Sequence, residues 1–119
     1  MQKILFISDP HICVPGQRII GLDPSARFVQ VLAAAVSAHP DAAALVLLGD
    51  LTHHGLPAEY AELARTLHAA PIPIIPMIGN HDRRDAFLAQ FPDAPQTPQG
   101  HIQSWRDIGD HRIITMDSA

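Results

Sequence analysis

Three short apolar runs are spread through the sequence, over Lys3 to Ser8, Ala44 to Leu48 and Pro71 to Ile78. Runs of this length without polar alternation are typical of strands that are covered on both faces, as in a parallel sheet. The last run contains Pro73 and Pro76. Because proline cannot donate a hydrogen bond to a β-ladder, that strand is expected to be irregular or partly edge-like. The pattern predicts three buried strands.

Apolar residues at helical spacing follow the predicted strands. Asp23-Pro24 is a typical helix start, with an N-cap side chain and then proline at the first helical position, and this helix is expected to end at His39. A second helix is predicted over Pro57 to Ala69 and a short third helix over Arg83 to Phe91. Strands that alternate with helices indicate an α/β fold with a mostly parallel sheet and right-handed crossovers.

The last part of the chain has a different pattern. Pro92 to Gly100 is rich in proline and glutamine and is predicted to be a loop. His101 to Trp105 and Arg112 to Thr115 are predicted to form an antiparallel hairpin, with Trp105 packed in the core. The chain ends soon after this hairpin, so we expect residues 1–119 to form a single domain that stops before its fold is complete.

Composition narrows the classes of function. With 119 residues the chain is long enough for one domain with a core and too short for two, and 47% of its residues are apolar. A formal net charge of -4 argues against a binder of nucleic-acid polymers, which would present a basic face. Cys13 is the only cysteine, and neither a signal peptide nor a bilayer-length apolar stretch is present. We therefore expect a cytoplasmic protein without a membrane partner.

Candidate metal ligands follow each predicted strand directly, in the segments Asp9-Pro10-His11, Gly49-Asp50 and Gly79-Asn80-His81-Asp82. In a parallel sheet, ligands bind beyond the carboxyl ends of the strands, where such segments converge. Asp9 and His11 are two residues apart, so in an extended chain both would leave the same side and hold one ion. Asp50 follows the central strand and is expected to lend one oxygen to each of two ions. Asn80 adds a neutral amide oxygen.

These residue types predict a metal-dependent hydrolase of phosphate esters. Imidazole, carboxylate and amide ligands suit Fe, Mn, Zn or Co. Two ions about 3.5–4 Å apart would neutralise the phosphate, lower the pKa of a bridging water to make hydroxide, and align it with the leaving oxygen. His81 is expected to be catalytic, either by stabilising the developing charge or by protonating the leaving group. Gly49 and Gly79 let the backbone turn sharply beside the ions.

The same motifs carry a resemblance to a known family. Asp9-x-His11, Gly49-Asp50 and Gly79-Asn80-His81-Asp82, in this order, resemble the calcineurin-like metallophosphoesterase superfamily. The longer segments Gly49 to Gly55 and Gly79 to Arg84 are similar to its class III cyclic-nucleotide phosphodiesterases and glycerophosphodiesterases. The match runs through the whole chain but covers only about the N-terminal half of the family's domain.

The resemblance implies a fold and a set of roles. The implied fold is the N-terminal half of a four-layer αββα sandwich, with the antiparallel hairpin at its C-terminal end. Asp9, His11 and Asp50 would bind the first metal ion. Asp50 and Asn80 would bind the second ion, and His81 would contact the substrate. The implied activity is hydrolysis of a small phosphodiester, such as a 3',5'-cyclic nucleotide or a glycerophosphodiester.

Two departures from the family leave alternatives open. The family supplies further histidines from later in its sequence, including a Gly-His-x-His motif that this chain lacks, and Pro10 stands where threonine, serine or leucine is more usual. One alternative is a catalytically incomplete fragment that binds metal weakly or serves as a protein-interaction module. A homo-oligomer is a further alternative, because an open sheet edge favours pairing with a second copy.

Four other polar residues lie beside the motifs. His53 and His54 are in the loop after Asp50, and we expect both to be solvated rather than close to the substrate. Arg83 and Arg84 follow the last motif, where they can either meet a phosphate or form a solvated helix start. The sequence does not decide between these two interpretations of the arginines.

Overall fold

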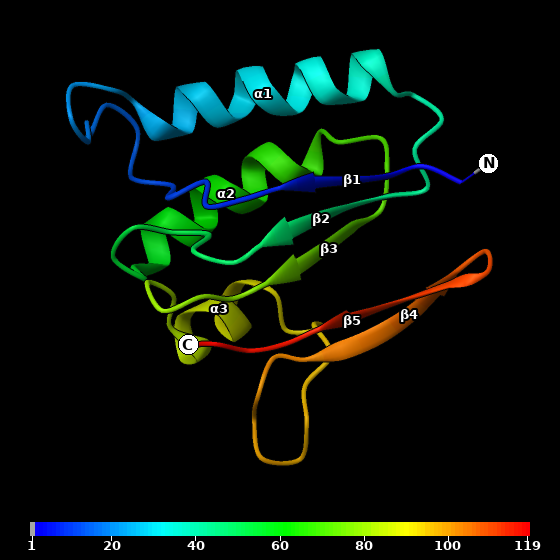
Figure 1. Cartoon of the computed structure of the whole chain (residues 1–119). Helices are drawn as coiled ribbons and strands as arrows, with labels where there is room; N and C mark the ends of the chain where they lie inside the picture. Colours follow the sequence, from blue (N-terminus) through cyan, green and yellow to red (C-terminus); the bar gives the residue numbers. More distant parts are fainter. Residues whose placement is uncertain (1) are drawn as a thin grey trace.

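The parallel sheet predicted from the apolar runs is present. A computed structural model of the chain describes residues 2–119. It contains β1 (Ile4–Ile7), β2 (Ala44–Leu48) and β3 (Ile74–Met77), which pair in parallel in the order β1-β2-β3 (Figure 1). β2 is the central strand, and β3 lies at an edge, as its prolines indicated. The carboxyl ends of all three strands therefore meet at one edge of the sheet.

Alternation along β2 sends its side chains into two separate hydrophobic clusters. Leu45 and Leu47 have no exposed surface and belong to the cluster on the helical face of the sheet. Ala44 and Val46 are equally buried on the opposite face, where they pack with Ile75 of β3. Residues 44–47 of β2 are buried on both faces, which explains why the sequence of this strand is continuously apolar. β1 and β3 are only partly buried, so the prediction of three buried strands is right for β2 alone.

Three helices cover the first face of the sheet (Figure 1). α1 (Pro24–Ala38) begins where predicted, because the Asp23 side chain caps it by accepting a hydrogen bond from the Ala26 N–H at 3.0 Å. α2 (Pro57–His68) and α3 (Arg84–Gln90) follow β2 and β3. The buried helical residues that join the first cluster are Phe28, Leu32, Tyr60, Leu63, Ala86 and Phe87.

A hairpin covers part of the opposite face. β4 (Ser104–Ile108) and β5 (His111–Thr115) pair antiparallel and are separate from the parallel sheet. Ile108 and Ile113 pack against the second hydrophobic cluster. The layers are therefore helices, parallel sheet and hairpin, which confirms an α/β fold with a mostly parallel sheet and a C-terminal antiparallel hairpin. Within residues 2–119, no helix has the length and apolar character needed to cross a bilayer.

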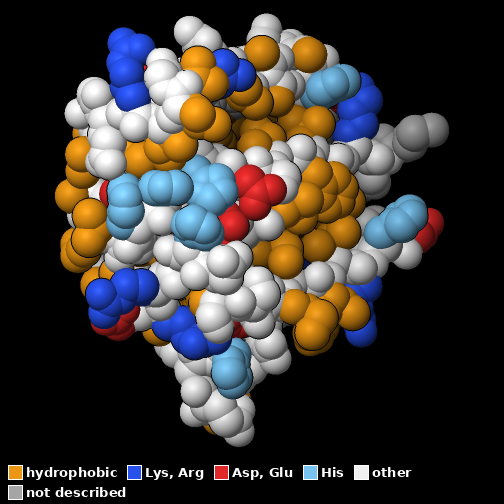
Figure 2. Space-filling view, turned by 60° about the vertical axis from the view of Figure 1, so that its left-hand side comes forward, with side chains coloured by type: hydrophobic (Ala, Val, Ile, Leu, Met, Phe, Trp, Pro, Cys, Tyr) orange, Lys and Arg blue, Asp and Glu red, His pale blue; other side chains and the backbone are white. Residues whose placement is uncertain are grey.

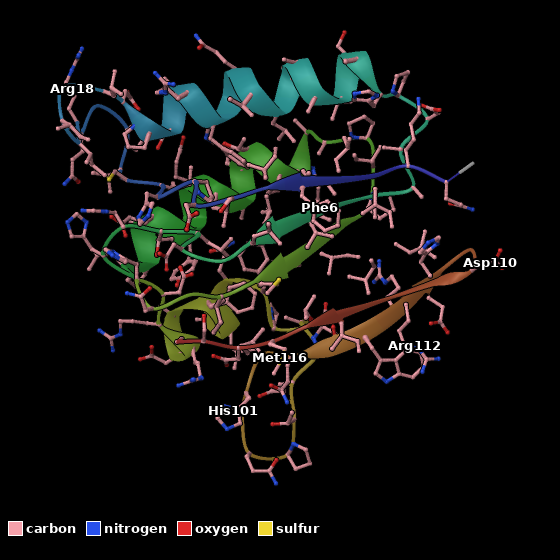
Figure 3. The ribbon with its side chains drawn as sticks, viewed as in Figure 1. Phe6, Arg18, His101, Asp110, Arg112 and Met116 are labelled. Carbon is pink, nitrogen blue, oxygen red and sulfur yellow. The ribbon has the colours of Figure 1, made fainter. Side chains whose placement is uncertain are left out.

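The prediction that Trp105 packs in the core is wrong. Trp105 pairs with Ile114 across the hairpin, and both residues lie on its outer side with exposed fractions of 61% and 66%. The indole ring instead lies 4.1 Å from the guanidinium carbon of Arg112, which Figure 3 shows on the hairpin. The register of the hairpin places Trp105 on the outer face. Ile108 and Ile113 lie on the opposite face of the hairpin and supply its apolar contacts to the sheet.

Candidate metal centre

The loops that follow β1 and β2 run side by side beyond the sheet. The His11 N–H donates to the Asp50 carbonyl at 3.0 Å, and the Ile12 N–H donates to the Leu51 carbonyl at 2.9 Å. The His53 N–H then donates to the Ile12 carbonyl at 3.0 Å. These bonds continue the pairing of β1 with β2 past the ends of the strands, so the two candidate ligand segments are held together.

Left-handed backbone conformations turn three candidate ligands into the site. Asp9, His11 and Asp50 have φ angles of +51°, +45° and +46°, and among residues 2–119 the only other non-glycine residue with positive φ is Ile20. The chain at Asp9 and His11 is therefore not extended, so that premise of the prediction is wrong, although the two side chains do converge. A left-handed residue costs roughly 1–3 kcal/mol, and such residues cluster at functional sites.

These turns bring the side chains of Asp9, His11 and Asp50 together, with one ligand atom of each within 4.8 Å of the others. His11 Nε2 lies 3.7 Å from Asp50 Oδ2. Asp9 is exposed while the other two residues are half-buried, so the group is accessible from solvent. Figure 2 shows histidine side chains gathered beside acidic ones on this face. Two carboxylates and an imidazole fit a divalent transition-metal ion.

Asn80, the fourth predicted ligand, belongs to the same edge of the sheet. Its neighbour Gly79 is packed so closely on Asp50 that a Cβ at this position would lie 2.5 Å from the Asp50 nitrogen. On the other side, the His81 N–H donates to Asp50 Oδ1 at 3.0 Å. Asn80 is exposed between these two contacts. Metal ligation by the four residues, and a catalytic role for His81, stay predictions.

His53 lies in a cluster of imidazoles and not in a solvated loop, so that expectation is wrong. The ring atoms of His11, His53 and His81 also come within 4.8 Å of one another. The rings of His53 and His81 stack with centroids 5.2 Å apart. Burial lowers the pKa of His53, and positive charge on the neighbouring histidines lowers it further. The only sequence signal for His53 was its place three residues after Asp50, and loop residues have no periodicity that indicates their direction.

A buried carboxylate joins the loops on either side of the site. Oδ2 of Asp82 accepts hydrogen bonds from the N–H groups of Leu51 and Gly79, both at 2.9 Å. Oδ1 accepts from the backbone N–H and the hydroxyl of Thr52, both at 3.0 Å, and from the Tyr60 hydroxyl at 2.9 Å. Asp82 is part of the last motif, but the sequence indicated no role for it. Its role is to hold the loops after β2 and β3 together.

A second buried carboxylate, Glu59, holds the end of the loop after β2, just before α2 begins. It accepts hydrogen bonds from the backbone N–H groups of His54 and Leu56 at 3.0 and 3.2 Å, and it lies 2.7 Å from His54 Nδ1. His54 is exposed, as predicted, although its ring is held at Nδ1 by Glu59. Cys13 is buried close by, and burial together with the nearby negative charge of Glu59 raises the pKa of its thiol.

The two arginines after the last motif have different partners. Arg84 contacts the Asp117 carboxylate through Nε at 2.8 Å and through its terminal nitrogen at 2.9 Å. Arg83 pairs with Asp85 on the exposed surface at the start of α3. Arg84 therefore ties α3 to the segment after β5, and Arg83 fits the solvated helix start. Neither contact uses the arginines to line the candidate metal site.

A groove opens beside Asp9 and His11. It has a volume of about 480 Å³ and extends from the ends of β1 and the following loop to the start of α1. Its walls are largely apolar, with Ile19, Leu22 and Phe28 among the lining residues, and His53 is part of its lining. A ligand that binds at the carboxylates can therefore place an apolar group in the groove.

Comparison with known proteins places this geometry in a family. Residues 2–117 match the profile of the calcineurin-like phosphoesterase family. Two similar proteins are a probable cyclic nucleotide phosphodiesterase of Rhodopseudomonas palustris, 37% identical over 116 residues, and another of Rhodococcus erythropolis, 36% identical over 124 residues. Each alignment covers 98% of this chain, but the chain spans only 42% and 40% of the lengths of these two relatives.

A solved structure supports the fold alone. The crystal structure of a protein of unknown function from Aquifex aeolicus has a TM-score of 0.50 and 24% sequence identity. The alignment covers 96% of this chain and 59% of that chain. The family match, the grouped His and Asp side chains at the strand ends and the shared fold agree with one another. The chain belongs to the calcineurin-like phosphoesterase family, whose members are metal-dependent phosphoesterases.

Proposed function

We propose that this chain supplies the N-terminal part of a centre with two divalent metal ions that hydrolyses small organic phosphodiesters, with 3',5'-cyclic nucleotides as the first substrate class. The observation that carries the proposal is the group formed by Asp9, His11 and Asp50, whose ligand atoms lie within 4.8 Å of one another beyond parallel strands. The buried free thiol of Cys13 is consistent with a reducing, cytoplasmic location.

The residues of the chain have distinct roles in this proposal. Asp9, His11, Asp50 and Asn80 hold the ions. When bound, the ions supply positive charge to the phosphate and lower the pKa of water. The Nδ1 of His81 lies 2.8 Å from the His53 carbonyl, so its Nε2 is the nitrogen that can exchange a proton with a substrate.

The groove beside the carboxylates supports an organic substrate over a simple phosphate. Its apolar walls suit a nucleobase or a similar flat group next to a bound phosphate. Arg27 also lines the groove and is a candidate for a polar contact to that group. The names of the two bacterial relatives agree with cyclic nucleotides as the first substrates to test.

The test is Mn²⁺-dependent hydrolysis of bis-p-nitrophenyl phosphate and of a 3',5'-cyclic nucleotide by the purified chain. Turnover that is lost in Asp50→Asn and in a chelated sample of the unchanged protein would show that these 119 residues form a working site by themselves. Exposed His68→Ala, at the end of α2, is the matched control for loss of an imidazole. A folded chain that binds Mn²⁺ without turnover would reject hydrolysis by these 119 residues and favour the second candidate.

The second candidate is a module that binds metal weakly and associates with a protein partner. That partner can be a second copy of the chain. The exposed apolar side chains on the sheet favour it, since Phe6 on β1 (Figure 3) is 56% exposed and Leu48 on β2 is 40% exposed. Self-association predicts a mass in light scattering that rises with protein concentration. A monomer at every concentration would reject the homo-oligomer.

A further inference from the structure

His53 contacts two other histidines of the site through two different atoms. Its ring Nδ1 lies 3.3 Å from Nδ1 of His11. Its backbone carbonyl lies 2.8 Å from Nδ1 of His81. One residue therefore meets the same ring nitrogen of both partners, once with its side chain and once with its main chain.

The contact with the carbonyl determines where His81 carries its proton. A carbonyl oxygen can only accept a hydrogen bond, so Nδ1 of His81 must be the protonated nitrogen. In a neutral imidazole the other nitrogen, Nε2, then keeps its lone pair. His81 is thus held as the tautomer whose Nε2 is free to accept a proton or bind an ion.

The two nitrogens of His11 face different groups. Nδ1 is next to His53, while Nε2 is 3.7 Å from Asp50 Oδ2 in the group of candidate metal ligands. A nitrogen that binds a metal ion needs its lone pair, and a metal-binding histidine usually donates its other N–H to a fixed acceptor. Between the two Nδ1 atoms, one must donate and the other accept. Nε2 of His11 is 3.7 Å from Asp50 Oδ2, beyond hydrogen-bond distance, so His11 keeps its proton on Nδ1 and is the donor both with and without an ion.

We infer that His53 is a positioning residue that sets the tautomers of both His11 and His81. Its ring accepts the hydrogen bond from Nδ1–H of His11, and its carbonyl accepts the one from Nδ1–H of His81. Both partners then present an unprotonated Nε2. The inference rests on the proposed metal-dependent function for its purpose, but the proton positions can be measured without any metal.

The backbone around His53 is held by contacts that do not involve its ring. The His53 N–H donates to the Ile12 carbonyl at 3.0 Å, and the preceding Thr52 is bound through its N–H and hydroxyl to Asp82. Removing the ring should therefore leave the carbonyl in place. The two hydrogen bonds can be separated, because a side-chain substitution removes the acceptor for His11 and keeps the acceptor for His81.

The first experiment measures the ring tautomers in the metal-free chain by long-range ¹H–¹⁵N NMR. In the unchanged protein we expect the proton on Nδ1 of both His11 and His81. In His53→Ala, His11 should shift to a mixture in which Nε2–H predominates, as in free imidazole side chains, while His81 stays unchanged. In His53→Asn, whose side-chain oxygen occupies about the position of Nδ1, His11 should return toward Nδ1–H. His68→Ala should change neither ring.

The second experiment measures Co²⁺ binding by calorimetry and by the visible absorption of the bound ion. Loss of a partner that orients a metal-binding histidine typically weakens metal affinity by roughly 10–100-fold. We expect a loss of this size in His53→Ala, partial recovery in His53→Asn and no change in His68→Ala. The number of ions bound per chain should stay the same in all variants.

Three results would overturn the inference. The first is an unchanged His11 tautomer in a folded His53→Ala, and the second is a shift of His81 together with His11, which indicates a collapsed loop. The third is the loss of one Co²⁺ per chain in His53→Ala, which would make His53 a ligand in the group with His11 and His81. Failure of the unchanged protein to bind Co²⁺ would reject the proposed function, while the NMR result would still decide the tautomers.

Discussion

Gly79 and Asp50 are in direct backbone contact at the carboxyl ends of β3 and β2. A Cβ at Gly79 would lie 2.5 Å from the Asp50 nitrogen and even closer to its Oδ1. The contact joins the loops that carry Asp50 and Asn80, and it leaves no space for any side chain at position 79.

Gly79→Ala is expected to move these loops apart. Overpacking of this kind typically destabilises a protein by roughly 1–3 kcal/mol, and here the displaced groups include a candidate ligand. We expect lower stability in urea and a loss of Mn²⁺ affinity. Gly100→Ala is the control, because a Cβ there meets nothing within 4 Å and the cost comes from its φ of +87°. Equal Mn²⁺ affinity of Gly79→Ala and the unchanged chain would contradict the prediction.

Asp82→Asn should destabilise the fold more than Tyr60→Phe. An amide in place of the carboxylate turns an NH₂ group toward at least one of the backbone N–H groups that now donate to Asp82. A buried N–H without an acceptor costs roughly 1–3 kcal/mol. Tyr60→Phe removes one hydroxyl, which donates to Asp82 and accepts from the Arg83 N–H.

Urea denaturation of both variants and of the double variant checks this prediction. We expect the two effects not to add, because both residues belong to one hydrogen-bond network. The burial that raises the pKa of Tyr60 also keeps its hydroxyl protonated as a donor at neutral pH. Additive effects, or a larger loss in Tyr60→Phe, would show that Asp82 is not the centre of the network.

The pair formed by Asp117 and Arg84 predicts a pH dependence of stability. Burial of Asp117 raises its pKa, but hydrogen bonds from Arg84 and from the N–H groups of Ile102 and Ala119 outweigh burial and lower it. The folded pKa is then below the unfolded value of about 3.9. The contribution to stability is complete above that value and is lost as the pH falls through the folded pKa.

Urea denaturation between about pH 5 and pH 2 measures this loss, and the free energy of unfolding should fall toward the acid end. In Asp117→Asn the fall should be shallower, and the variant should be less stable than the unchanged chain at pH 7. The exposed pair of Asp107 with Arg112 offers a comparison, and Asp107→Asn should change the acid slope less. Identical slopes for the unchanged chain and Asp117→Asn would contradict the assignment.

Metal addition should stabilise the chain through Asp50. An ion that binds only the folded state at 100 times its dissociation constant adds about 2.7 kcal/mol to the free energy of unfolding. We expect the melting temperature to rise with Mn²⁺ and to fall again when a chelator is added. Asp50→Asn should abolish the rise, while Asp93→Asn, on the exposed loop after α3, should retain it. A rise of equal size in Asp50→Asn would indicate binding elsewhere.

Much of the fold could be predicted because its signals are local. The continuous apolar runs predicted the three strands, and Asp23-Pro24 predicted the start of α1. Trp105 shows the limit of this reasoning. Both faces of a short hairpin can carry apolar residues, and the choice of the inner face depends on how the hairpin docks on the sheet. That docking is a contact between the hairpin and strands that are distant from it in the chain.

The candidate site was also predictable only in part. The motifs placed Asp9, His11, Asp50 and Asn80 beyond strand ends, and a parallel sheet must bring such ends to one edge. The sequence did not indicate the left-handed turns at Asp9, His11 and Asp50, because a local pattern does not specify φ for a polar loop residue.

The sequence alone determined the order of strands and helices, the edge where the polar motifs meet and the family resemblance. These depend on side-chain periodicity and on residue types that can be read along the chain. Only the tertiary structure decided that the ring of His53 turns toward His11 and that Asp82 joins two loops. The physical reason is that the direction of a loop side chain is set by hydrogen bonds to residues distant in the sequence, and no repeating pattern records those partners.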